Sequence, residues 1–184
     1  SFSNLTITNG LSERGGGIHS ERANISLDNV HIVDNHLIDQ DGFGTEEGGG
    51  IYLNGFNGSN FSMIDCIVSG NGGPGTYNSG GGLWLIDLED MIIDRCSINE
   101  NQGRSASALG ISGGGDPTTL VTHIIRNTEF IGNSAEVGIS SVIRLESYYA
   151  HLDMENVLIR DNDVRDYHYV IFAYGSGTFR NVTI

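Results

Sequence analysis

The chain has 184 residues, of which 38% are hydrophobic, which is enough for one ordinary domain or one stack of repeats around a buried core. Its formal net charge is -14, and all nine basic residues are arginines. Because phosphate binding needs a basic face, we expect no nucleic-acid surface, and an anionic polysaccharide is disfavoured as well. No apolar run reaches the ~18 residues of a membrane helix, so we expect no membrane insertion by this segment.

A glycine-led element recurs along the chain with a period of roughly 30 residues. Glycine triplets precede Ile18, Ile51 and Leu83, and weaker copies follow at Gly110-Ile111, Val142-Ile143 and Val170-Ile171. A fixed period of this size is typical of a solenoid, a propeller or another repeat array.

A second element recurs out of phase with the first. It spans Ile25–Asn35, and its copies are Phe61–Asn71, Met91–Asn101, His123–Asn133 and Leu152–Asn162, with partial copies Phe2–Ile7 and Phe179–Ile184. Apolar and polar residues alternate within it, which predicts short strands separated by corners. Three such strands per unit predict an all-β fold, a parallel β-helix of about six coils, whereas a propeller blade needs four strands and a longer repeat. The partial copies share one phase, so we expect a single domain over residues 1–184 that is a segment of a longer solenoid.

Two columns of polar residues are predicted to stack from coil to coil. The first occupies a corner, where asparagine tolerates left-handed backbone conformations: Asn4, Asn29, Asp65, Arg95, Asn127, Asn156 and Asn181. The second ends the third strand of each unit: Asn35, Asn71, Asn101, Asn133 and Asn162. We expect hydrogen-bonded ladders whose role is structural.

Paired motifs give the chain a resemblance to a known group. The first motif stands as Gly16-Gly17-Ile18, Gly49-Gly50-Ile51 and Gly81-Gly82-Leu83. The second stands as Phe130-Ile-Gly-Asn133, relaxed to Ile32-Val-Asp-Asn35, Val68-Ser-Gly-Asn71, Ile98-Asn-Glu-Asn101 and Ile159-Arg-Asp-Asn162. The chain thus resembles the repeats of chlamydial polymorphic outer-membrane proteins and similar surface proteins, although a third glycine is added and isoleucine or valine mostly replaces phenylalanine.

This resemblance implies a right-handed parallel β-helix in a secreted or cell-surface protein. Its implied role is structural or adhesive: a rigid shaft that displays loops, chiefly residues 36–47, 54–60, 72–79 and 112–122. The open ends of a solenoid carry unpaired strand edges, so we expect as partner a second copy of the chain, by end-on or lateral assembly into a fibre, or else a surface glycan or receptor. Fold alone does not establish such a function.

A candidate ligand face follows from the glycine-led strand. Its first apolar residue points inward, so the next residue should face outward: His19, Tyr52, Trp84, Ser112, Arg144 and Phe172. Beside them, Gly17, Gly50, Gly82 and Gly110 would form a shallow trough. A sugar ring could lie against Tyr52 and Trp84, with Asp87, Glu89 and Asp90 of the following loop taking its hydroxyls. A purely stabilising aromatic ladder is the alternative.

Polysaccharide cleavage, by a lyase or a glycoside hydrolase, is the competing activity for this face. A lyase needs a basic residue and a carboxylate-bound cation, and Arg144 is the only well-placed basic residue. A hydrolase needs two carboxylates across the bond, for which Glu46 or Glu47 with Asp87 is the best pair. Neither set forms a dedicated cluster, so the sequence favours a module without catalysis.

The remaining candidate sites are weaker. No histidine or cysteine pattern predicts a metal centre or another cofactor, and calcium is considered only for the acidic stretches 39–47 and 161–166. Cys66 and Cys96 share one ladder position, where either a disulfide or two stacked thiols would fit. Five glycosylation sequons are present, at Asn4, Asn24, Asn57, Asn60 and Asn181, and those at Asn57 and Asn60 are expected in a projecting loop.

Overall fold

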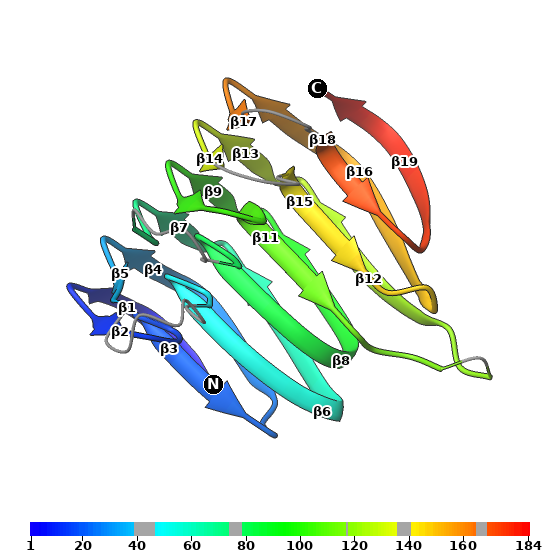
Figure 1. The fold of residues 1–184 in the computed structure, drawn as a ribbon, viewed down its shortest axis with the longest axis horizontal. Coiled ribbons are helices and arrows are strands. Elements are labelled where there is room, and N and C mark those ends of the chain that lie inside the picture. The colour runs from blue at the N-terminus through cyan, green and yellow to red at the C-terminus, as the bar shows by residue number, and fades with distance from the viewer. Residues whose placement is uncertain (39–46, 74–78, 117, 136–140, 165–168) are drawn as a thin grey trace.

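The computed structural model describes residues 1–38, 47–73, 79–116, 118–135, 141–164 and 169–184. Every regular element among them is a β-strand, and every strand pairing is parallel. The strands follow one another around a core and rise coil by coil in chain order, as the colour sequence of Figure 1 shows. This arrangement confirms the predicted parallel β-helix.

Three walls enclose the core. The first face consists of β3 (Ile18–Glu21), the beginnings of β6 (Ile51–Ile64) and β8 (Leu83–Asp94), β11 (Ala106–Ser112), β15 (Ser141–Glu146) and β18 (Tyr169–Ala173). The second consists of the ends of β6 and β8, with β12 (Val121–Arg126) and the beginnings of β1 (Phe2–Thr8), β4 (Ile25–Val33), β16 (Ala150–Arg160) and β19 (Ser176–Thr183). The third consists of the ends of β1, β4, β16 and β19, with β7 (Ile67–Ser69), β9 (Ser97–Asn99) and β13 (Glu129–Ile131).

Short strands complete most of the coils. They are β2 (Leu11–Ser12), β5 (His36–Leu37), β10 (Gln102–Gly103), β14 (Ser134–Ala135) and β17 (Asp163–Val164). Two predicted loops are corrected: residues 54–60 lie within β6, and residues 112–122 include the end of β11 and the start of β12. The other two, 36–47 and 72–79, fall largely outside the described residues.

At the corner between the second and third faces of each coil, the backbone adopts a left-handed conformation. The backbone φ angle at Asn29, Asp65, Arg95 and Asn127 lies between 50° and 53°. Asparagine amides bond from coil to coil: Asn29 Nδ2 donates to Asn4 Oδ1 at 2.9 Å, and Asn156 Nδ2 donates to Asn127 Oδ1 at 3.1 Å. Asn181 Nδ2 likewise donates to Asn156 Oδ1 at 2.8 Å. Arg95 and Asp65 interrupt this column with a bidentate ion pair, both nitrogen–oxygen distances being 2.7 Å.

The second asparagine column lies inside the molecule. Asn35, Asn71, Asn101 and Asn133 are at most 1% exposed. The Asn71 backbone N–H and side-chain Nδ2 both donate to Asn101 Oδ1 at 3.0 Å, and Asn101 repeats this pattern with Asn133. Because each amide also donates to a backbone carbonyl of the preceding coil, the column satisfies buried polar groups in a continuous ladder.

The glycine column packs against this ladder and forms no trough. A Cβ added at Gly50 would lie 2.7 Å from the Gly82 carbonyl oxygen and 3.2 Å from the Asn71 side chain. Gly82 has the same relationship to Ala108 and Asn101. The predicted trough is therefore wrong: at Gly50 and Gly82 the backbone carbonyl of the next coil, together with the buried asparagine, leaves no room for a side chain.

Candidate functional site

The predicted ligand face around Tyr52 and Trp84 is not exposed. Tyr52 is 3% exposed and Trp84 is 5% exposed, and they form a second hydrophobic cluster with Ala106 on the outside of the first face, against which Ile86 packs. Their side chains do point away from the main core, as predicted, but further packing covers them. Neither ring can serve as an open platform for a sugar in this structure.

The register of the first face explains how Trp84 is covered. Trp84 pairs with Gly110, and Gly110 pairs with Arg144, so the outward column runs His19, Tyr52, Trp84, Gly110, Arg144, Phe172. The prediction placed Ser112 in this column and Gly110 in the glycine column, which is a shift of two residues. Ser112 instead pairs with Ile86 and Glu146.

The charged residues of the predicted face are engaged within the protein. Glu47 pairs with Arg14 at 3.3 Å, and burial raises the pKa of Glu47 although Arg14 opposes the shift. Burial likewise raises the pKa of Tyr52. The Arg14 guanidinium lies 5.5 Å from the centre of the Tyr52 ring. His19 is exposed; its ring meets that of Tyr52 edge-on at 5.1 Å, and its Nε2 lies 3.5 Å from Glu21.

The candidate hydrolase pair is not brought together. Asp87 lies at the corner of β8, with φ of 51°, and its Oδ1 accepts a hydrogen bond from the Gly114 backbone N–H at 3.2 Å. Glu47 lies before Ile51, at the start of the first face. Asp87 lies after Ile86, which pairs with Asn54 at the end of the same face. The two carboxylates therefore lie at opposite ends of the first face. Glu46 lies outside the described residues.

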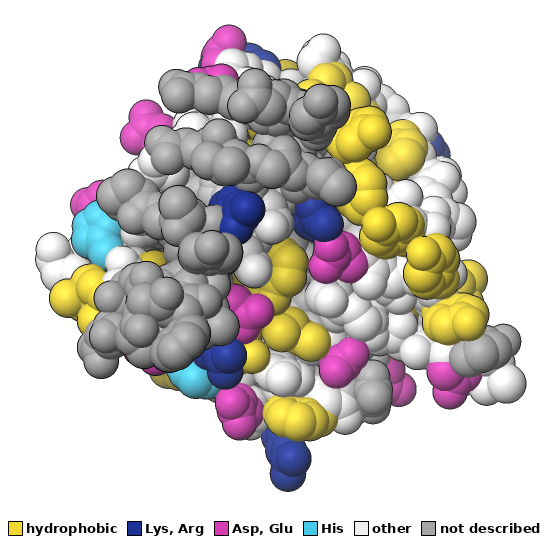
Figure 2. All heavy atoms as spheres, in the orientation of Figure 1, with side chains coloured by type: hydrophobic (Ala, Val, Ile, Leu, Met, Phe, Trp, Pro, Cys, Tyr) yellow, Lys and Arg dark blue, Asp and Glu magenta, His cyan; other side chains and the backbone are white. Residues whose placement is uncertain are grey.

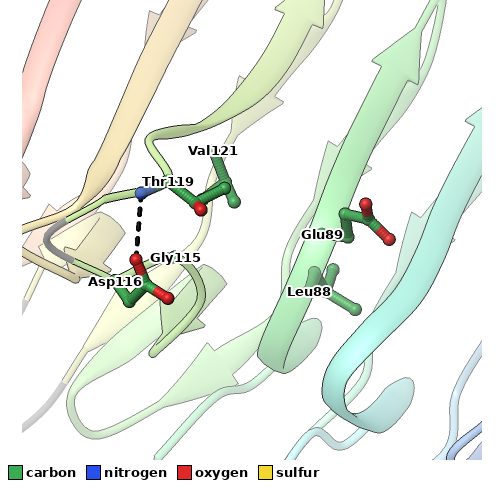
Figure 3. Close-up of a pocket in the computed structure, with 6 residues that line it drawn as sticks. All are labelled: Leu88, Glu89, Gly115, Asp116, Thr119 and Val121. Atoms are coloured by element: carbon green, nitrogen blue, oxygen red, sulfur yellow. Dashed lines mark hydrogen bonds between the residues drawn. The ribbon is translucent and has the colours of Figure 1, made fainter.

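A small pocket lies next to this corner and contains one predicted residue, Glu89. Its volume is about 270 Å³, and its lining residues are Leu88, Glu89, Gly115, Asp116, Thr119 and Val121. Figure 3 shows Leu88 and Glu89 on β8, to the right of the loop that carries Asp116 and Thr119. Leu88 and Val121 are buried and provide apolar contact, while Glu89 and Asp116 are exposed carboxylates.

Asp116 provides the pocket with an ionised carboxylate. Asp116 Oδ1 receives the Thr118 backbone N–H and hydroxyl at 2.7 Å and the Thr119 backbone N–H at 2.9 Å, and these bonds hold the Asp116 pKa below its usual value. A carboxylate kept ionised in this way suits a ligand hydroxyl or a cation and does not suit a general acid.

An exposed aromatic face was missed by the sequence analysis. Tyr148, Tyr169 and Tyr174 are 71%, 52% and 49% exposed. With Phe172 they form a chain of ring contacts: the centroids of Tyr148 and Tyr174 are 5.2 Å apart, those of Tyr174 and Phe172 are 4.9 Å apart, and those of Phe172 and Tyr169 are 5.5 Å apart. We call these four residues the aromatic face.

The aromatic face lies on β18 and on the turns that follow β15 and β18. Figure 2 shows a band of hydrophobic side chains across the upper right of the view, where these elements lie in Figure 1. Arg144 supports it from the preceding coil: its guanidinium lies 5.0 Å from the Phe172 ring centre and bonds Glu146. The signal for this face was the concentration of tyrosines between residues 148 and 174, which the repeat alignment did not use.

Comparison with known families assigns the fold. The family model described as the right handed beta helix region matches residues 1–142. The chain belongs to the right-handed β-helix family. A comparison with solved structures finds no significant match for this β-helix.

Among the described residues, no group of three or more histidine, cysteine or acidic side chains is placed to hold a metal ion. Of the acidic stretches considered for calcium, residues 39–46 of the first and residues 165–166 of the second lie outside the described part of the chain. No helix in the part of the β-helix that the structure describes is long and apolar enough to cross a membrane.

The sequons of the β-helix fall on strands and corners. Asn4, Asn24, Asn60 and Asn181 are exposed. Asn57 and Asn60 belong to β6 and not to a projecting loop, and the Asn57 side chain lies outside the described residues. The Asn24 Oδ1 accepts the Asn60 backbone N–H at 2.8 Å, so these two sequons meet on adjacent coils. Their glycosylation stays a prediction.

Proposed function

We propose that this β-helix is an extracellular adhesive module, a rigid shaft whose aromatic face contacts neutral glycan on a partner surface. The observation that supports it is the connected set of exposed rings at Tyr148, Tyr169, Phe172 and Tyr174. Clustered exposed rings on an otherwise polar protein mark interaction surfaces, because tyrosine offers apolar contact area together with a hydroxyl.

The shaft itself supports a structural role. The internal asparagine ladder runs from Asn35 to Asn162 in one hydrogen-bonded direction, and the core is continuous beside it. Interdigitated cores deform little, so a face built on these coils keeps its ring geometry. A preorganised platform loses less conformational entropy when a ligand binds.

Charge and ring chemistry favour a neutral glycan over other ligands. The net charge of -14 repels polyanions in general. A sugar ring presents C–H groups on its faces and hydroxyls on its edge, which complements aromatic rings flanked by tyrosine hydroxyls. The proposed glycan site therefore lies at the aromatic face, and not at Tyr52 and Trp84, where the sequence predicted it.

A binding panel tests this proposal. Neutral polysaccharides such as glucans, mannans and galactans would be titrated with the wild-type chain and with Tyr148→Ala/Tyr174→Ala. We expect binding by the wild type and a loss of more than ~10-fold in the double variant, because each exposed ring anchor contributes about 1–2 kcal/mol. Tyr149→Ala, at a neighbouring exposed ring outside the aromatic face, is the matched control. Equal binding by the wild type and the double variant would overturn the proposal.

Assembly of the shaft into a fibre, by end-on or lateral contacts, stays a separate prediction. Electron microscopy of the native full-length protein tests it: filaments or stalks would support it, and discrete monomeric particles would count against it. The glycan experiment is done on the isolated chain, and its double variant changes Tyr148 and Tyr174 on turns, whereas Tyr169 and Phe172 lie on β18, the edge strand that an end-on contact would cover.

A further inference from the structure

Cys66 and Cys96 are neighbours on adjacent coils. Ile67 pairs with Ser97, the Ser97 backbone N–H donates to the Cys66 carbonyl at 2.9 Å, and the Asp65 backbone N–H donates to the Asp94 carbonyl at 3.1 Å. The two cysteines are therefore in register within a parallel pair, where Cα atoms are about 4.8 Å apart. That separation lies within the range that disulfides span. Both are free thiols in the structure.

The two thiols differ in their surroundings. Both thiols face backbone carbonyl oxygens, Cys66 that of Ile64 at 3.1 Å and Cys96 those of Asp94 and Met63 at 3.2 Å and 3.4 Å. The Cys66 sulfur in addition accepts the Val30 backbone N–H at 3.4 Å. A hydrogen bond from the Cys96 thiol lowers the Cys66 pKa to about 7, and the same bond with burial raises the Cys96 pKa. Cys66 is thus the better nucleophile of the pair.

Both side chains also reach a surface groove. They are 1% and 4% exposed, yet they line an open groove of about 510 Å³ whose rim carries the Asp65–Arg95 ion pair. The other charged residue lining the groove is Glu129, and Asp28 acts on Cys66 from the preceding coil. Because both residues belong to the buried core cluster, an oxidant reaches their sulfur atoms only when the coils open locally toward this groove.

We propose that Cys66 and Cys96 form a reversible disulfide that links two coils when the surroundings become oxidising. The thiolate of Cys66 attacks one sulfur of glutathione disulfide and releases one glutathione thiolate, which takes up a proton. Cys96 then loses its proton to solvent, attacks the Cys66 sulfur of the mixed disulfide and releases the second glutathione. In total, two protein thiols are oxidised, and one glutathione disulfide is reduced to two glutathione molecules.

The geometry makes this link reversible. In-register side chains on parallel strands project in the same direction, so their Cβ atoms stay about 4.8 Å apart, beyond the ~4.5 Å upper end for a disulfide. Closing the bond must draw the two coils together against their packing. A strained disulfide is reduced more easily than a structural one, so we expect the link to open again in moderately reducing buffer.

Redox titration followed by mass spectrometry tests the proposal. The native chain is equilibrated with glutathione and glutathione disulfide at increasingly oxidising ratios, quenched with acid, denatured and alkylated. We expect the wild type to lose both alkylatable thiols together, without a retained glutathione, and to regain them at reducing ratios. Cys96→Ser should retain glutathione on Cys66, because no second thiol is left to release it, and Cys66→Ser should form no internal bond either.

Other outcomes would overturn the proposal. Two free thiols at every ratio in the native wild type would exclude the disulfide, as would stable glutathione adducts without an internal bond. Oxidation that occurs only in urea would show that the folded β-helix prevents the reaction. Circular dichroism of both serine variants confirms that they remain folded, and the wild-type result stands without them.

Discussion

The indole ring of Trp84 lies directly over the backbone of Gly110 in the next coil. A Cβ added at Gly110 would lie 1.9 Å from Trp84 Cε3, which no real contact allows. Gly110 is thus the position that lets the indole fold down onto the first face. The burial of Trp84 depends on this glycine as much as on the cluster with Tyr52 and Ala106.

Gly110→Ala should displace the Trp84 ring and destabilise the β-helix by about 1–3 kcal/mol, the usual cost of overpacking. Trp84 is the single tryptophan, so urea unfolding followed by its fluorescence reports both effects, including a red-shifted native emission. Gly58→Ala is the matched control, because nothing lies within 4 Å of a Cβ at Gly58. Equal midpoints for the two variants would refute this account of Trp84.

Asn101→Ala should cost about 3 kcal/mol of unfolding free energy. The change removes the oxygen that accepts both the backbone and side-chain N–H groups of Asn71, and leaving buried donors unpaired is costly. Denaturant unfolding measures the loss. Asn60→Ala, at an exposed position, should change stability by less than ~0.5 kcal/mol. Similar losses in the two variants would show that the internal ladder contributes little.

His123 should make the β-helix sensitive to acid. It is fully buried in the stack Met91–His123–Leu152, neither ring nitrogen has a hydrogen-bond partner, and burial lowers its pKa to about 4, although the Asp90 carboxylate opposes the shift. The unfolded chain, with a histidine pKa of about 6.5, binds a proton that the folded chain does not. Stability should therefore fall by about 3 kcal/mol as pH drops from about 6.5 to 4.

Unfolding free energies of His123→Leu measured across this pH range test the assignment. We expect a flatter pH dependence than in the wild type and higher stability at pH 5. His19→Gln, at an exposed histidine, should keep the wild-type slope. If His123→Leu kept that slope as well, another group would be responsible for it.

The sequence predicted the coil architecture because its signals are local. Left-handed corners need residues such as Asn29 and Asn127, and the internal column needs asparagine beside glycine, so both repeat visibly. The register at the fourth coil was not predictable in this way. Leu109 and Ile111 are both apolar and two residues apart, so a shift of two leaves the inward pattern unchanged while it exchanges Gly110 for Ser112 in the outward column.

The exposure of the candidate site could not be predicted from alternation either. Alternation tells which wall a side chain points through, but not what packs on the outside. Tyr52 and Trp84 point outward and are buried, whereas Tyr148 and Tyr174 lie on turns, where no periodic pattern applies, and are exposed. Contacts between coils decided both cases.

Hydrogen exchange of the glycan-bound chain tests the central claim most directly, since it locates the ligand among the possible sites. The account predicts slower exchange of backbone amides in residues 145–150 and 169–175 when a bound neutral glycan is present, with no change in residues 83–90 or 113–121. Protection centred on Glu89 and the loop that carries Asp116 and Thr119, with none near Tyr148 and Tyr174, would contradict it.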